Sequence, residues 1–270
     1  IAGDRGLGMP RPFRLAIGQS PAELVSPQER LDWLDSNLPK VAAQQTNLIL
    51  LPELFATGYN IGDEISGRSE AADGATAQSI SALARKHSVA IHYGFAEQGG
   101  SRIYNTAQCF GPDGTLLGGH RKLAIPPGFE TKYFAQGKGC RLFTYRGLRI
   151  ATLICYDAEF PEAVRHVASL GAELILVPTA LGDQWEWVAQ TMIPSRAYEN
   201  GVFLAYANSA GVENGMRFLG QSFIAAPDGL ILARAGADAG LIYAEIEPER
   251  VAKAQSRLPY LKDALKIRLT

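Results

Sequence analysis

The sequence of 270 residues lacks the features that mark several classes of protein. Its three cysteines, Cys109, Cys140 and Cys155, are odd in number and have no C-x-x-C spacing, which argues against a disulfide framework or a structural zinc site. Its apolar runs are about as long as a strand, well short of the roughly 20 residues that cross a bilayer. Runs of lysine and arginine are short and the formal net charge is −1, so nucleic acid and membranes are not expected as partners. These absences predict a protein of the reducing cytoplasm.

Histidine is also scarce. The chain has four histidines, scattered along its length, which argues against a histidine-rich metal centre: His87, His92, His120 and His166. Only His120 lies near a candidate motif, and there we interpret it as a polar residue at the end of a strand. We therefore expect no metal site.

Apolar residues, by contrast, are plentiful, at 47% of the chain with 20% charged, and can form a large buried core. A length of this order fits one α/β domain. Residues 1–8 resemble a leader segment or cloning remnant before Met9, and no secretory signal is evident. We accordingly expect a single domain over residues 9–270.

Strand and helix signals alternate along the chain. The clearest helix start is the capping box of residues 26–29 (SPQE), with proline at the first helical position. Further helices are expected at 73–87, 162–170 and 185–199, and strands at 13–19, 47–51, 89–96, 103–110, 115–122, 141–145, 148–154, 174–177, 202–207, 218–225 and 230–235.

The two halves of the chain echo each other. LILLPE at 48–53 returns as LILVPT at 174–179, and the turn GPDG at 111–114 returns as APDG at 226–229. Such repetition predicts two copies of an α/β unit. The expected architecture has two sheets face to face with helices outside, a four-layer αββα sandwich with an internal pseudo-two-fold axis.

Three chemically distinct side chains follow predicted strands. Glu53 comes after an apolar run and a proline, where partial loss of solvent raises a carboxyl pKa toward the range of a general base. Lys122 ends a strand as a compact ammonium, suited to stabilising an oxyanion. Cys155 lies between a strand and a helix start, near backbone N–H groups that lower a thiol pKa. Together an acid, an amine and a thiol indicate one active site.

Each of these residues also fits an ordinary structural role when taken alone. Glu53 fits a carboxylate that caps the next turn, Lys122 a solvated surface lysine, and Cys155 an inert buried thiol. The three occur together, each at a strand end. That combination favours the catalytic interpretation.

In these motifs the chain resembles the nitrilase superfamily, the carbon–nitrogen hydrolases, over almost its whole length. The matching segments are Pro52-Glu53-Leu54, His120-Arg121-Lys122-Leu123 and Ile154-Cys155-Tyr156-Asp157, with supporting matches at 104–107, 133–137, 160–162 and 196–200. The resemblance implies that Cys155 is the nucleophile, Glu53 the general base and Lys122 the oxyanion stabiliser. It also implies that Glu130 orients the lysine or the substrate.

The residues after the cysteine distinguish branches of the superfamily. True nitrilases carry Trp-Glu directly after the nucleophile, whereas this chain carries Tyr156-Asp157, which favours an amide over a nitrile. The pattern resembles bacterial amidases that act on small amides. The similar omega-amidase branch commonly has arginine where Glu159 stands. A carboxylate there would disfavour a substrate carboxylate and could accept from a substrate ammonium or amide N–H.

The resemblance therefore implies an amidase that releases ammonia from a small carboxylic amide through a cysteine thioester. The alternatives are a nitrilase, an omega-amidase or an N-carbamoyl hydrolase of the same superfamily, and a scaffold without catalysis. No cofactor or metal is expected, because the lysine ammonium supplies the electrophilic assistance. A homodimer or larger homo-oligomer is expected. The pocket walls are predicted to come from a set that also fits core packing: Tyr59, Asn60, Tyr156, Glu159, Phe160, Trp185 and Trp187.

Overall fold

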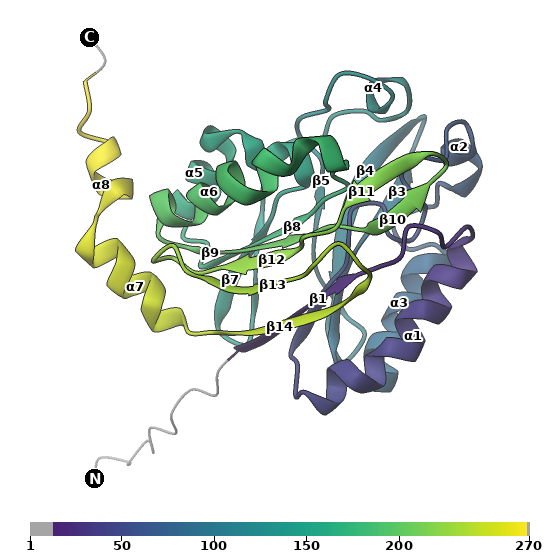
Figure 1. Ribbon diagram of the computed structural model, residues 1–270, viewed down its shortest axis with the longest axis horizontal. Coiled ribbons are helices and arrows are strands. Elements are labelled where there is room, and N and C mark those ends of the chain that lie inside the picture. The colour runs from purple at the N-terminus through teal and green to yellow at the C-terminus, as the bar shows by residue number, and fades with distance from the viewer. Residues whose placement is uncertain (1–12, 269–270) are drawn as a thin grey trace.

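Two six-stranded sheets lie face to face in the computed structural model, which describes residues 13–268 (Figure 1). The segment 1–8, predicted to be a leader, lies outside the described residues. The first sheet has the order β14 (Gly240–Ile246), β1 (Phe13–Gln19), β2 (Leu48–Leu50), β3 (Ala90–Gly99), β4 (Arg102–Phe110) and β5 (Leu116–Arg121). The second has the order β6 (Leu142–Tyr145), β7 (Leu148–Thr152), β8 (Leu174–Pro178), β9 (Phe203–Ala207), β12 (Phe223–Ala225) and β13 (Ile231–Arg234).

The two sheets repeat one topology. In each, three central strands run parallel, namely β1, β2 and β3 in one and β7, β8 and β9 in the other. Antiparallel strands flank them on both sides. The turns 111–114 and 226–229 join equivalent pairs, β4 to β5 and β12 to β13. The sheet order therefore carries the duplication that the sequence echo predicts.

Helices cover the outer face of each sheet. Helices α1 (Pro27–Ala43) and α3 (Ala75–His87) pack on the first sheet, and α5 (Pro161–Ser169) and α6 (Ile193–Asn200) pack on the second. The predicted capping box starts α1, with Ser26 Oγ accepting from the Glu29 backbone N–H at 3.2 Å. Four further helices are short or peripheral: α2 (Glu64–Arg68), α4 (Glu130–Tyr133), α7 (Pro248–Arg257) and α8 (Tyr260–Ala264).

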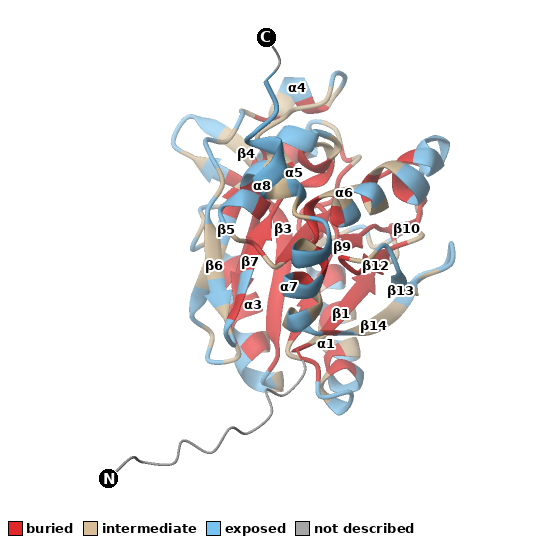
Figure 2. Cartoon of the chain, turned by 90° about the vertical axis from the view of Figure 1, so that its left-hand side faces the viewer, coloured by how far each residue is buried: buried red, intermediate tan, exposed pale blue. Residues whose placement is uncertain are grey.

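The apolar runs of the central strands follow from this layering. In β2, Leu48 and Leu50 point to the core between the sheets, while Ile49 points to the helices outside. In β8, Leu174 and Leu176 face inward and Ile175 faces the helices. Because both faces are covered, successive residues are all apolar, as is usual for buried parallel strands. Figure 2 shows the labelled central strands β1, β3, β7 and β9 largely in red, the colour of buried residues.

Two predicted elements differ from the structure. The helix expected at 185–199 is continuous over 186–200, but it follows a 3₁₀ turn (Asp183–Trp185) and contains a π-helical turn (Val188–Met192) before α6. Pro194 has no N–H to donate and lies at the start of α6, directly after the π-helical turn, and the helical backbone continues through it. The strand expected at 218–225 is two strands, β11 (Met216–Leu219) and β12, because Gly220 and Gln221 both have positive φ. Strand β11 pairs with β10 (Ala210–Glu213) in a separate hairpin.

The C-terminal segment forms the helices α7 and α8 at one edge of the molecule (Figure 1). Val251 and Ala254 of α7 are buried, and the remainder of the segment is largely exposed. Within residues 13–268, none of the helices combines the length and apolarity that a membrane span requires.

Candidate active site

The structure brings three buried ionisable residues, Glu53, Lys122 and Glu130, into contact. Lys122 follows β5 directly and is fully buried. Its ammonium donates to Glu53 Oε1 at 2.6 Å and to both carboxylate oxygens of Glu130 at 2.8 Å. Burial works against the charged form of Lys122, but the negative charge of Glu53 and its other anionic neighbours outweigh it and raise the pKa of Lys122. The lysine is thus held as a cation between two carboxyl groups.

Glu53 has one occupied and one free carboxylate oxygen. Oε1 accepts from Lys122 and, at 2.7 Å, from Asn105 Nδ2. Oε2 is buried and has no hydrogen-bond partner among residues 13–268. Burial raises the pKa of Glu53 to about 7, the nearby Lys122 charge opposes this, and Glu130 adds to it. The sequence also predicts a raised pKa for Glu53. Because Oε2 has no partner among residues 13–268, it can accept a proton.

Cys155 lies beyond the end of β7, at the start of a 3₁₀ turn (Cys155–Glu159). Its φ of 47° is left-handed, a conformation that costs a non-glycine residue on the order of 1 kcal/mol and is common at functional sites. The expectation of a lowered thiol pKa is wrong for this structure. Burial raises the pKa of Cys155, and the charges of Glu53 and Glu130 raise it further against the opposing effect of Lys122. The resting group is therefore a thiol that needs a base.

Asp157 ties the nucleophile turn to the segment after Lys122. One carboxylate oxygen accepts from the backbone N–H groups of Leu123 and Ala124 at 2.9 and 2.8 Å. The other accepts from the Ile154 backbone N–H at 3.0 Å and lies 2.9 Å from His120 Nε2. His120 is thus a buried strand-end residue that supports this connection.

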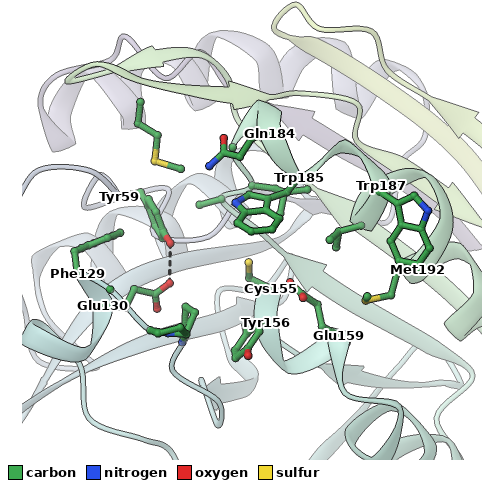
Figure 3. A pocket seen from close by; sticks show the side chains of 18 residues that line it. Tyr59, Phe129, Glu130, Cys155, Tyr156, Glu159, Gln184, Trp185, Trp187 and Met192 are labelled. Atoms are coloured by element: carbon green, nitrogen blue, oxygen red, sulfur yellow. Dashed lines mark hydrogen bonds between the residues drawn. The ribbon is translucent and has the colours of Figure 1, made fainter.

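A cavity of about 880 Å³ is lined in part by Glu130 and Cys155. Figure 3 shows the Cys155 sulfur and the Glu159 carboxylate both pointing into it. Tyr59, whose hydroxyl donates to Glu130 Oε1 at 2.7 Å, also lines it. The remaining predicted lining residues in contact with the cavity are Tyr156, Trp185 and Trp187; Phe129, Gln184, Met192 and Met216 contribute without having been predicted.

Two of the predicted pocket residues lie elsewhere. Asn60 does not line the cavity, because its amide donates to the carbonyls of Glu213 and Asn214 and so fixes the β10–β11 hairpin. Phe160 is 39% exposed and packs edge-on against Tyr156, with ring centroids 4.9 Å apart, outside the cavity. The prediction that Asn60 and Phe160 form part of the cavity wall is therefore wrong.

Three contributors were missed by the sequence reasoning. Asn105, in the supporting match at 104–107, donates to Glu53 Oε1 at 2.7 Å. Gly94 is required because a Cβ there would lie 2.5 Å from the Leu54 backbone nitrogen, so only glycine lets β3 approach the Glu53 loop. Thr179 donates its hydroxyl to the Cys155 sulfur at 2.9 Å. The echo between the halves could have identified it, because Thr179 occupies the position equivalent to Glu53.

Known proteins share this sequence and this fold. Over 256 residues the chain is 39% identical to a Pseudomonas protegens protein described as "Hydrolase in pqqF 5'region", covering 93% of this chain and 88% of that protein. It is 33% identical to an (R)-stereoselective amidase of Pseudomonas sp., covering 84% and 82% of the two chains. The crystal structure of an amidase from Nesterenkonia sp. superposes with a TM-score of 0.82 at 31% identity, covering 92% of this chain and 95% of that one.

The family model of the carbon–nitrogen hydrolases matches residues 14–256, which include Glu53, Lys122, Glu130 and Cys155. That span also contains both sheets and the helices α1, α3, α5 and α6 that enclose them. This chain belongs to the carbon–nitrogen hydrolase family, within the nitrilase superfamily.

Proposed function

We propose that the protein is an amidase that hydrolyses a small carboxylic amide to the acid and ammonia. One observation carries the proposal. A buried lysine ammonium contacts the carboxyl groups of Glu53 and Glu130, and Glu130 lines the same cavity as the Cys155 thiol. This arrangement supplies a base, a nucleophile and a fixed positive charge for the oxyanion.

Acylation follows from the positions of these groups. Glu53 takes the thiol proton as the Cys155 sulfur attacks the amide carbonyl carbon. The carbonyl oxygen becomes an oxyanion, stabilised by the Lys122 ammonium and by the Tyr156 backbone N–H, which lies in the first turn of a 3₁₀ helix. The C–N bond then breaks, and protonated Glu53 returns the proton to the departing nitrogen. Ammonia leaves and a thioester on Cys155 remains.

Deacylation uses the same groups. Glu53 is again ionised and removes a proton from a water molecule, whose oxygen attacks the thioester carbonyl. Lys122 stabilises the second oxyanion, and the C–S bond breaks to release the acid. The proton held by Glu53 returns to the sulfur, so that the site regains its starting state.

The relatives support an amide as the substrate class. One of them is described as an (R)-stereoselective amidase. The structure of the Nesterenkonia amidase has been solved in complex with butyramide, for a variant in which alanine replaces a cysteine. Another of its variants carries the acetamide moiety of fluoroacetamide on the active-site cysteine. In both cases a small amide or a fragment of one is bound to a protein that matches this chain over more than nine-tenths of its length.

Ammonia release from a matched panel tests the proposal. Purified protein is incubated with butyramide, butyronitrile and an N-carbamoyl amino acid, and ammonia is measured over time. We expect butyramide to give the highest kcat/KM. Faster release from the nitrile or the carbamoyl compound would assign a different branch, and no release from any of them would favour a scaffold.

The pH dependence with a neutral amide follows from the raised pKa of Glu53. Below that pKa the carboxyl is protonated and cannot accept the thiol proton, so kcat/KM for butyramide should rise as the pH increases through about 7. The ascending limb reports the coupled Glu53–Lys122–Glu130 group. A profile that is flat across the neutral range would contradict Glu53 as the base.

A further inference from the structure

Glu159 presents a carboxylate to the cavity without a protein partner. Its side chain lines the cavity next to Cys155 and Tyr156. Within the described part of the chain no group donates a hydrogen bond to this carboxylate; Arg196 instead donates to the Glu159 backbone carbonyl at 2.8 Å. Burial raises the pKa of Glu159, against the opposing charges of Lys122 and Arg196.

The other charged groups of the site are already paired. The Lys122 ammonium contacts Glu53 and Glu130, and the Arg196 guanidinium contacts Glu199 at 3.1 Å. Trp185 and Trp187 also line the cavity and expose 56% and 62% of their surfaces. An anionic substrate group would meet Glu159 unfavourably. A cationic group would gain a charge-assisted hydrogen bond and aromatic faces on which to rest.

We infer that Glu159 is a specificity-determining residue that selects amides whose acyl chain carries an ammonium or another N–H donor, and that rejects acyl chains ending in a carboxylate. This inference rests on the proposed amidase function. It names the substrate class of the same site, with the amide at Cys155 and the cationic end at Glu159.

Three amides of similar length but different charge test the inference: γ-aminobutyramide, valeramide and succinamate. At mildly alkaline pH, where Glu159 is ionised, kcat/KM should be about tenfold or more higher for γ-aminobutyramide than for valeramide, and lowest for succinamate. In Glu159→Gln, the ratio between the cationic and the neutral amide should fall toward 1. The matched control is Glu162→Gln, an exposed carboxylate outside the cavity, which should keep the wild-type ratios.

The outcomes separate this inference from the proposed function. If valeramide is hydrolysed but γ-aminobutyramide has no advantage, or if Glu159→Gln keeps the advantage, the role of Glu159 is wrong and the amidase proposal stands. If none of the three amides is hydrolysed, both fail.

A second inference concerns Thr179, which rests on a different contact. The Thr179 hydroxyl lies 2.9 Å from the Cys155 sulfur and 3.1 Å from the Tyr206 hydroxyl, and all three residues are buried. A threonine hydroxyl has one proton, so when Thr179 donates it to sulfur, Tyr206 can donate to Thr179. Burial raises the pKa of Tyr206, so its hydroxyl stays protonated and remains a donor.

The geometry points to a hydroxyl pair, Tyr206 to Thr179 to sulfur, that stabilises the Cys155 thiolate as it forms. Two equivalent strand ends would then act on the same thiol, because Glu53 follows β2 and Thr179 follows β8. The Glu53 backbone N–H donates to the Thr179 carbonyl at 3.3 Å, so the two ends are in contact. One copy of the duplicated unit supplies the proton acceptor for the thiol, and the other supplies the donor to the sulfur.

Thr179→Val removes the hydroxyl and keeps the shape, and Thr179→Ser is its rescue control. We expect Thr179→Val to lower kcat/KM for butyramide about tenfold and to move the pH profile of Cys155 alkylation by iodoacetamide to higher pH, with Thr179→Ser close to wild type. A packing role alone would not move the alkylation profile. If Thr179→Val folds and its profile superimposes on that of the wild type, the inference is wrong.

Discussion

Replacing Cys155 with alanine is expected to lower the turnover of butyramide by at least about 10⁴-fold, because no other thiol of residues 13–268 lines the cavity. The other described cysteines are badly placed to substitute for it. Cys109 is fully buried, and Cys140 is half-buried and does not line the cavity. The free energy of unfolding should change by only about 1 kcal/mol, because alanine fills most of the space that the cysteine side chain occupies. Ammonia release and thermal unfolding measure the two effects.

Cys140→Ala is the matched control for this experiment. It removes a free thiol outside the cavity, so its ammonia release should equal that of the wild type. Turnover by Cys155→Ala within a hundredfold of the wild type would show that another residue carries the reaction.

Replacing Lys122 is expected to have the second largest effect, a fall of about 10³-fold or more in kcat. Loss of one oxyanion donor alone costs about 10²–10³-fold. The change also removes the positive charge that lowers the pKa of Glu53 against the effect of burial. The Glu53 carboxyl is then protonated to a greater extent at neutral pH and accepts the thiol proton less readily. Lys122→Met keeps the length of the side chain and removes the ammonium. Initial rates with butyramide measure the loss.

Stability must be measured beside activity, because Lys122 contacts two buried carboxyl groups. Breaking a buried ion pair costs about 3–5 kcal/mol if the remaining charge persists, and less if the carboxyls take up protons. The loss of stability in Lys122→Met relative to the wild type should therefore be smaller at mildly acidic pH than at alkaline pH. The control Lys132→Ala removes an exposed lysine that pairs with Asp63 and should change neither activity nor stability. A folded Lys122→Met with wild-type kcat would contradict the oxyanion role.

Much of the fold could be predicted because burial on both faces leaves a clear pattern. The apolar runs around Leu50 and Leu176, the capping box at Ser26 and the two Pro-Asp-Gly turns each depend on local chemistry. The echo between halves then defines which strands are equivalent. The β10–β11 hairpin was missed because its strands have four residues each and are partly exposed, whereas β14 was missed although its seven residues are mostly apolar.

The candidate site was predictable as far as its strand ends. Glu53 and Cys155 each follow a recognisable apolar strand, Lys122 follows the second strand of a hairpin marked by its turn, and the structure places Glu53 and Lys122 in direct contact. Side chains that act through distant backbone groups were not predictable in the same way. Asn60 looks like a pocket residue in sequence, yet it binds a hairpin more than 150 residues away. The raised pKa of Cys155 also depends on its burial, which a strand end does not reveal.

The expected homo-oligomer and the single domain over 9–270 remain predictions. The proposed chemistry does not require the oligomer, because the residues that carry it all come from one chain: Glu53, Lys122, Glu130 and Cys155. Sedimentation of the purified protein over a range of concentrations would measure the assembly directly.

The central claim is that Cys155 becomes acylated during turnover. Protein mixed with butyramide is quenched in acid within a few turnovers, digested, and analysed by mass spectrometry. The account predicts that the peptide containing Cys155 gains the mass of one butyryl group and loses it on treatment with hydroxylamine, as a thioester does. Steady ammonia release with that peptide unmodified, or with the butyryl group on another residue, would contradict the account.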